Sequence, residues 1–304
     1  MRLRQFQRTL STSQFTLPLI CMAALGIWLI DGSGDFTGMA LTALTAFMIA
    51  ELCNRNILLR YSSRMVCAFF VVLITASPFF HAFQSGHIIM QLTLLSYFSL
   101  FATFQQSNAP GLTYTTYLFI GIGALLYPKL IWIVPVYWLS QIFLHSMTVK
   151  HFMASLLGVM TPLWIGIAFA LFKDRWADAD THIQQMIAFQ WGGYDALSLK
   201  QWLAVIFASL AFFVGVCDFQ SRNFFDKSHT RVVCDAIISF GVLDFILLMI
   251  QPTCFRELFP MFLVNSSILS GHYIATATGR AANFSVILIS LAAVVLIILN
   301  IWML

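Results

Sequence analysis

The sequence contains very little charge. Of its 304 residues, 9% are Asp, Glu, Lys or Arg, whereas 60% are hydrophobic. A water-soluble domain needs about 25% charged residues, so this composition excludes a soluble globular protein. The apolar residues form successive runs of about 16–22, the length that crosses a hydrocarbon core about 30 Å thick. The chain is therefore predicted to be a polytopic α-helical membrane protein.

Sequence motifs of catalytic and cofactor-binding sites are also missing. The sequence has no Gly-rich phosphate loop, no nucleophile elbow and no His-Glu-x-x-His pattern. Its six cysteines are scattered without a Cys-x-x-Cys pair, which is typical of small packing residues and not of a metal or redox site. The basic residues form no stripe for nucleic acid. We therefore expect no cofactor, no metal, no nucleic-acid partner and no recognisable catalytic residue; the partner that composition does require is the lipid bilayer.

The fold class predicted is all-α, a transmembrane bundle of about eleven spans forming a single domain over residues 1–304. The spans are expected near 15–30, 37–53, 65–80, 88–104, 112–126, 130–147, 152–172, 200–217, 232–250, 258–276 and 281–303. The fifth and sixth are joined only by Tyr127-Pro128-Lys129. Because Pro128 disfavours helix in the preceding residue, they are predicted to form a tight hairpin or a broken pair that does not fully cross.

The distribution of basic residues predicts the orientation. With eleven spans and the N-terminus in the cytoplasm, 11 of the 16 Lys and Arg residues fall inside and five outside. This is the direction of the positive-inside rule. Losing one span would move the cluster at 222–231 to the outer side, so the bias supports the odd number as well.

One outer loop, 173–200, is long and too polar to span. Apolar residues share one helical face of it (Trp176, Ile183, Ile187 and Trp191), and polar residues share another (Asp174, Asp178, His182 and Gln185). This pattern predicts one amphipathic helix lying in the membrane interface. Asp174, Asp178 and His182 also resemble metal ligands, but they would spread over about 12 Å, so a wetted polar face is the favoured interpretation.

Two acids lie in the apolar hairpin 234–276, a costly place for charge. Asp244 and Asn265 lie at equal depth on the two antiparallel helices, and so do Asp235 and His272, since the paired numbers add to 509 and 507. Nine residues separate the two acids, which places them on opposite faces, so only one can point at the returning helix. We favour Asp244 paired with Asn265. The pair either fixes packing or belongs to a path for substrate or protons.

Two weaker features complete the candidates. Asp31 and Asp35 lie in the first outer loop, where enzymes that use polyprenyl-phosphate sugar donors often keep a catalytic Asp; here the loop has only about five residues, which favours a simple polar turn. A stripe of small residues on the eighth span allows another helix, including one of a partner membrane protein, to approach closely. Its members are Ala204, Ala208, Ala211 and Gly215.

The run Ser155-Leu-Leu-Gly-Val-Met-Thr-Pro-Leu-Trp164, after the Tyr127-Pro128 turn, resembles an uncharacterised family of polytopic inner-membrane proteins from Bacteroidota. The resemblance implies a bacterial inner membrane and no known activity, so it transfers no functional residue.

Three functions remain open. A carrier or flippase-like protein for an envelope precursor or small solute is favoured slightly, because polar groups lie within mid-membrane helices. A lipid-linked glycan transferase or polymerase would use the outer loop and the Asp31/Asp35 turn. A non-catalytic assembly subunit would use the small-residue stripe. A water-filled cavity reaching Asp244 would favour the carrier.

The topology yields a first test. Reporter fusions at 220–230 are expected to be cytoplasmic and fusions at 176–191 external, because an odd number of spans separates the N-terminus from the outer loop. Both reporters on one side would contradict the topology.

Overall fold

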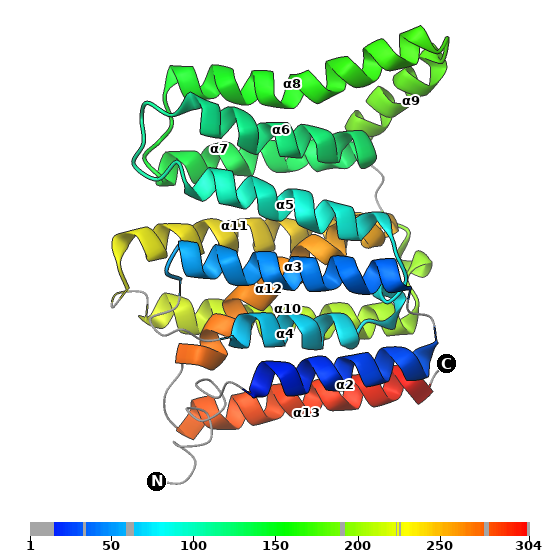
Figure 1. The fold of residues 1–304 in the computed structure, drawn as a ribbon, viewed down its shortest axis with the longest axis vertical. Coiled ribbons are helices and arrows are strands. Elements are labelled where there is room, and N and C mark those ends of the chain that lie inside the picture. Colours follow the sequence, from blue (N-terminus) through cyan, green and yellow to red (C-terminus); the bar gives the residue numbers. More distant parts are fainter. Residues whose placement is uncertain are drawn as a thin grey trace.

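A computed structural model describes residues 15–32, 35–58, 64–188, 192–222, 224, 226–276 and 280–302. Within these ranges the regular structure is helical and contains no strand (Figure 1). The all-α fold class is thereby confirmed. The α-helices are α2 (Thr16–Asp31), α3 (Phe36–Arg55), α4 (Met65–Thr75), α5 (Ser85–Phe101), α6 (Pro110–Leu126), α7 (Val134–Phe143), α8 (Val149–Phe172), α9 (Trp176–Ile187), α10 (Leu199–Arg222), α11 (Ser228–Ile250), α12 (Phe255–Thr276) and α13 (Arg280–Trp302). Short 3₁₀ helices are η1 (Pro78–Phe80), η2 (Pro128–Ile133), η3 (Tyr194–Ala196) and η5 (Pro252–Cys254).

The long helices run along a common direction, and α13 ends at the opposite end of the bundle from the start of α2 (Figure 1). In the described part of the chain, one α-helix lies within or across each of the eleven predicted spans, and α9 is additional. The predicted boundary at residue 80 was wrong, because α4 ends at Thr75. Ser77 precedes Pro78 and takes a non-helical conformation (φ −121°, ψ 75°), as the residue before proline does.

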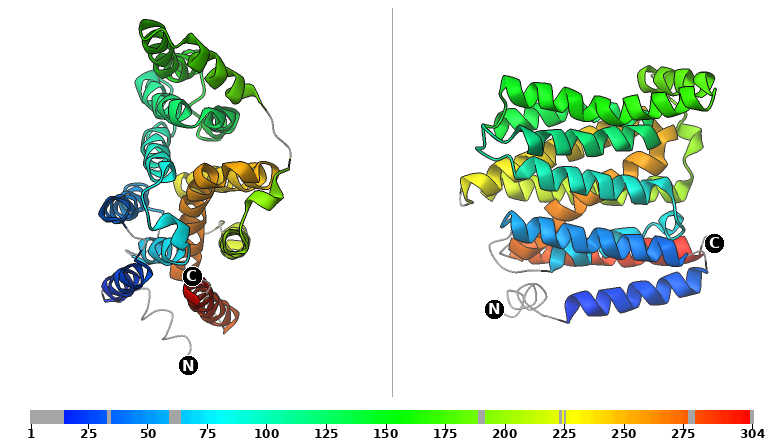
Figure 2. Two further views of the ribbon diagram at one scale, coloured as in Figure 1. Left: turned by 90° about the vertical axis from the view of Figure 1, so that its right-hand side faces the viewer. Right: turned by 45° about the horizontal axis from the view of Figure 1, so that its top comes forward.

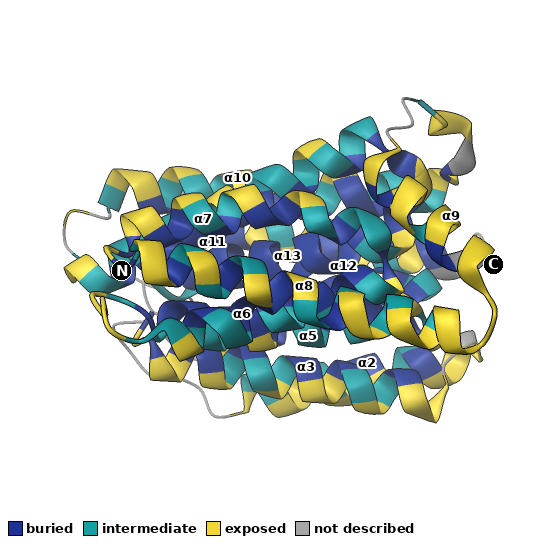
Figure 3. Cartoon of the chain, turned by 90° about the horizontal axis from the view of Figure 1, so that it is seen from above, coloured by how far each residue is buried: buried dark blue, intermediate teal, exposed yellow. Residues whose placement is uncertain are grey.

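Five described helices are long and apolar enough to cross a membrane. They are α3, α8, α10, α11 and residues Ala282–Asn300 of α13. Their outward side chains are apolar: Leu157, Trp164 and Phe169 of α8 are exposed, as a lipid-facing surface requires (Figure 3). These helices support a membrane-embedded protein. The full number of eleven crossings stays a prediction.

The connection between the fifth and sixth predicted spans is a sharp turn, as expected. Tyr127 is extended (φ −136°, ψ 100°) and Pro128 begins η2. After the turn α7 runs back along α6: Gln141 Nε2 of α7 lies 3.2 Å from Thr113 Oγ1 of α6, and Gln141 Oε1 lies 3.3 Å from the Tyr117 hydroxyl, so the hairpin is present. α7 also packs against α11, while α6 packs most closely against α8. That the pair does not fully cross a membrane stays a prediction. At about 2.0 Å per 3₁₀ residue and 1.5 Å per α residue, η2 and α7 together extend about 27 Å.

The helix α12 occupies the middle of the bundle and crosses it obliquely (Figures 1 and 2). It packs against α4, α5, α10 and α11, and every residue from Leu258 to Ile274 is buried. Protein therefore replaces lipid around its whole circumference. For this reason α12 can carry a run of polar residues that a lipid-exposed helix could not.

The small-residue stripe of α10 faces α12. All four stripe residues are buried, and Ser266 Oγ of α12 donates a hydrogen bond to the carbonyl oxygen of Ala208 at 2.9 Å. The close approach predicted for the stripe thus occurs inside the chain. The expectation of a partner protein at this face is corrected, since α12 already covers it.

The segment 173–200, predicted to be an outer loop, does form a helix, α9, from Trp176 to Ile187. Residues 189–191, including the predicted anchor Trp191, lie outside the described residues. Trp176, Ile183 and Ile187 are exposed, whereas Ala179 and Met186 face the protein and are buried. The apolar face is therefore free to meet lipid, and its location in a membrane interface stays a prediction.

The contact at Gly215 generates a second test. A Cβ atom there would lie 2.8 Å from the carbonyl carbon of Leu269 and 3.0 Å from the nitrogen of Ser270, both rigid backbone atoms. We expect Gly215→Ala to lower the unfolding free energy in detergent by about 1–3 kcal/mol. Gly26→Ala is the control, because nothing lies within 4 Å of its added Cβ; helix propensity should make it stabilising by about 0.5–1 kcal/mol. Equal effects of the two substitutions would contradict close packing.

Candidate functional site

The predicted pair of Asp244 and Asn265 is present in the structure. Asn265 Nδ2 on α12 donates a hydrogen bond to Asp244 Oδ2 on α11 at 2.9 Å, and both residues are fully buried. The equal depth of the two positions places them together, and the absence of a side chain at Gly241 leaves room beside the Cβ of Asn265. The predicted pairing of Asp244 with Asn265 is confirmed.

A third member, Tyr97 of α5, was not predicted. Its hydroxyl donates to Asn265 Oδ1 at 3.0 Å. Because a tyrosine hydroxyl pointed at the amide oxygen leaves the NH₂ group for the acid, Tyr97 fixes which way the amide of Asn265 faces. The Tyr97 ring stacks on Phe240, one turn before Asp244, at 5.0 Å between centroids. We call Tyr97, Asp244 and Asn265 the Asp244 cluster.

The carboxyl group of Asp244 has one hydrogen bond for two oxygens. Its Oδ1 is buried and has no hydrogen-bond partner among the described residues. A buried carboxylate normally requires several donors or a cation, so a single amide donor leaves much of its desolvation cost uncompensated. Asp244 is therefore a costly side chain to keep in the interior, and such groups are frequently functional in membrane proteins.

The other two hairpin candidates are not brought together. Asp235 is half-buried and accepts a hydrogen bond from Gln220 Nε2 of α10 at 3.4 Å. His272 is buried on α12, where Phe219 packs edge-on against its ring at 5.7 Å. Asp235 and Asp244 lie on opposite faces of α11, as their spacing of nine residues predicted. For this reason only Asp244 points at α12.

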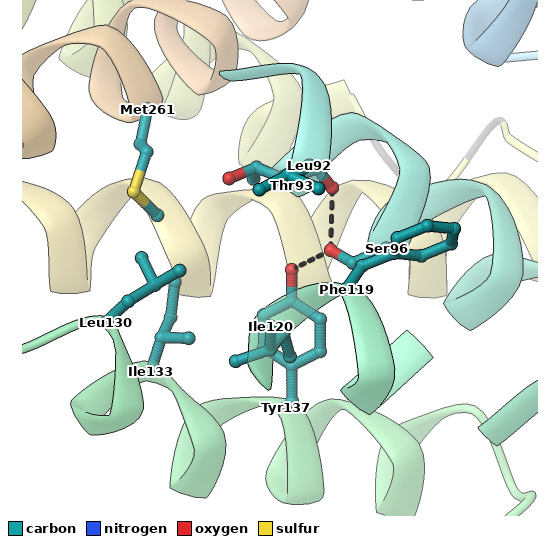
Figure 4. A pocket seen from close by; sticks show the side chains of 9 residues that line it. All are labelled: Leu92, Thr93, Ser96, Phe119, Ile120, Leu130, Ile133, Tyr137 and Met261. Atoms are coloured by element: carbon teal, nitrogen blue, oxygen red, sulfur yellow. Dashed lines mark hydrogen bonds between the residues drawn. The ribbon is translucent and has the colours of Figure 1, made fainter. Parts of the chain in front are cut away.

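A small cavity lies beside the Asp244 cluster (Figure 4). Its volume is about 10 Å³, which holds at most about one water molecule, and it is mostly apolar, with Leu92, Ile120, Leu130, Ile133 and Met261 among its walls. Its polar edge is formed by Ser96 and Tyr137, whose side-chain oxygens are 2.5 Å apart. The Tyr137 ring also lies 4.5 Å from Phe240 and 6.2 Å from Tyr97, which links the cavity to the cluster through aromatic contacts. Asp244 itself is not among the residues that line it.

The outer-face candidates form no common site. Asp35 occupies the N-cap position of α3 but is exposed and makes no capping hydrogen bond, and the side chain of Asp31 lies outside the described residues. Asp174 is exposed, and the side chain of Asp178 is likewise not described. His182 is half-buried and points inward, with Nε2 3.0 Å from the carbonyl oxygen of Ala124 near the end of α6.

His182 thus ties α9 to α6 and does not belong to the wetted face predicted for it. Among the residues that the structure describes, no group of three His, Cys, Asp or Glu side chains could hold a metal ion.

Comparison with protein-family models, curated proteins and solved structures finds no match. The family resemblance at Ser155–Trp164 therefore stays a prediction, and the function must be argued from the site.

The hydrogen bonds of the cluster generate a third test. Asp244→Asn keeps size and hydrogen-bonding capacity but removes the charge, so its stability in detergent should equal or exceed that of the wild type. Asp244→Leu should lose about 0.6–2 kcal/mol, because the Asn265 amide is left without its acceptor. Thermal unfolding of both variants measures the difference; a stable Leu variant would show that the hydrogen bond contributes nothing.

Proposed function

We propose that the protein is a membrane carrier, or a flippase-like protein, for a small solute or an envelope precursor, and that Asp244 is its working residue. The observation that carries the proposal is the fully buried carboxyl of Asp244, held by one amide donor between three central helices. A protein that needed only packing at this position would gain by replacing Asp244 and Asn265 together with apolar side chains of similar volume. The presence of the Asp244 carboxyl is consistent with a group that binds a substrate or a proton in another conformation of the protein.

The described arrangement corresponds to a closed state of such a carrier. Asp244 has no exposed surface, and the neighbouring cavity ends at Tyr137 and Ser96. Access to the acid would require α5, α11 or α7 to move relative to α12, since these helices enclose it. Ordinary carriers expose a central site alternately by such rearrangements of whole helices.

The setting belongs to the same proposal. Eleven crossings of a bacterial inner membrane, with the N-terminus in the cytoplasm, agree with the basic-residue bias, and the start of α2 and the end of α13 lie at opposite ends of the bundle (Figure 1). In this orientation α9 lies at the outer surface. The outer surface is also where the runner-up, a lipid-linked glycan transferase, would act; of its candidate acids, Asp35 is exposed and makes no capping hydrogen bond, and the side chain of Asp31 lies outside the described residues.

Genetic complementation tests the role of Asp244. In a strain lacking the gene, Asp244→Asn should be expressed and folded but should fail to restore the deletion phenotype, because an amide cannot release a proton or pair with a cation. Asp235→Asn is the matched control: the residue lies on the same helix, is half-buried and is outside the cluster. It should complement fully.

A stable, fully complementing Asp244→Asn variant would end the case for Asp244 as a working residue and leave the cluster as a packing device.

A further inference from the structure

A second buried polar chain joins α6, α7 and α8 at the other end of the interior. His151, in the first turn of α8, has no exposed surface. Its Nδ1 lies 2.6 Å from Thr113 Oγ1, and its Nε2 lies 3.3 Å from the carbonyl oxygen of Ser107. Thr113 Oγ1 is also 3.2 Å from Gln141 Nε2, and Gln141 Oε1 is 3.3 Å from the Tyr117 hydroxyl. We call these four side chains the His151 chain.

The carbonyl of Ser107 sets the direction of every hydrogen bond in this chain. A carbonyl can only accept, so Nε2 of His151 must carry the hydrogen. In a neutral ring Nδ1 then carries no hydrogen, so it accepts a hydrogen bond from the Thr113 hydroxyl. Thr113 in turn accepts from Gln141 Nε2, which turns Oε1 of the amide toward the Tyr117 hydroxyl. The neutral state therefore has a single direction, from Tyr117 to Ser107, and every member is satisfied.

A second proton on His151 would reverse this direction. Nδ1 would become a donor to Thr113, whose hydroxyl could then donate only onward, to Gln141. The amide would have to flip to present Oε1 to Thr113, which turns its NH₂ group toward Tyr117. The Tyr117 hydroxyl would change from donor to acceptor. Its ring packs edge-on against Tyr137, at the polar edge of the cavity, with 6.1 Å between centroids.

We propose that His151 is a proton-binding site that senses pH at the end of the bundle near residues 105–108, and that Thr113 and Gln141 pass its protonation state to Tyr117. The entry side is given by the structure: Ser107, which faces Nε2, belongs to an exposed segment, 105–108. This site is distinct from Asp244 and does not depend on the carrier function.

The surroundings make protonation consequential. His151 lies in the first turn of α8, and its ring contacts Thr113 of α6 and the carbonyl oxygen of Ser107. The elements around it provide no compensating acid: the titratable side chains are Tyr114 and Tyr117 on α6, Tyr137 on α7, exposed Lys150 on α8 and exposed His145 between α7 and α8. The positive charge of a protonated His151 must therefore be accommodated by reorienting the hydrogen bonds of Thr113 and Gln141. This reorientation couples the protonation of His151 to the orientation of the Gln141 amide.

Nitrogen NMR of the full chain in detergent tests the proposal between about pH 8 and pH 5, the range in which histidine changes charge. The His151 ring signals are assigned by their loss in His151→Gln, and the Gln141 side-chain amide by its loss in Gln141→Leu. At high pH we expect the Nε2–H tautomer. On acidification both ring nitrogens should become protonated, and the Gln141 amide signal should shift with the same midpoint.

Thr113→Val should abolish the Gln141 shift, because it removes the hydroxyl that connects the two residues. His145→Gln, which changes an exposed histidine of the adjoining segment, should leave both responses intact. An Nδ1–H tautomer at high pH, a histidine that stays neutral at pH 5, or a Gln141 signal that does not follow His151 would each overturn the proposal. If Thr113→Val does not fold, the wild-type comparison of the two midpoints decides.

Discussion

The enclosure of α12 is the constraint on which the rest of the structure depends. This helix carries Asn265, three serines and His272 within one apolar bundle, and hydrocarbon would not tolerate them. Surrounding it on all sides with α4, α5, α10 and α11 replaces lipid by partners that pack and donate hydrogen bonds. The peripheral helices can then remain almost entirely apolar, because they alone meet the membrane.

Small residues make this enclosure possible. Without a hydrophobic force between helices in lipid, association relies on close packing, and close packing requires backbones to approach. Gly215 of α10 meets the backbone of α12, Gly271 of α12 meets Val66 of α4, and Gly158 of α8 meets the backbone of α6. The same short distances that hold the bundle together also limit how its helices can move past one another, so rearrangement would involve whole helix groups.

The two buried polar systems differ in how completely their groups are satisfied. The His151 chain gives every member a partner, which fixes α6, α7 and α8 in one hydrogen-bonded arrangement. The Asp244 cluster leaves one carboxylate oxygen without a described partner. An incompletely satisfied group in the interior stores free energy that a substrate, a proton or water can release. This contrast is the physical reason for proposing Asp244 as the working residue.

The sequence by itself determined the membrane class, the helical fold and the level pairing of Asp244 with Asn265, because hydropathy and residue spacing are local properties. It also determined that Asp235 would point elsewhere. Only the tertiary structure decided that the stripe on α10 is covered by α12, that Tyr97 completes the cluster, and that His151 is buried. These depend on which helices become neighbours, and α5, α11 and α12 are brought together by contacts between residues as many as 168 positions apart. No local pattern in the chain encodes such neighbours.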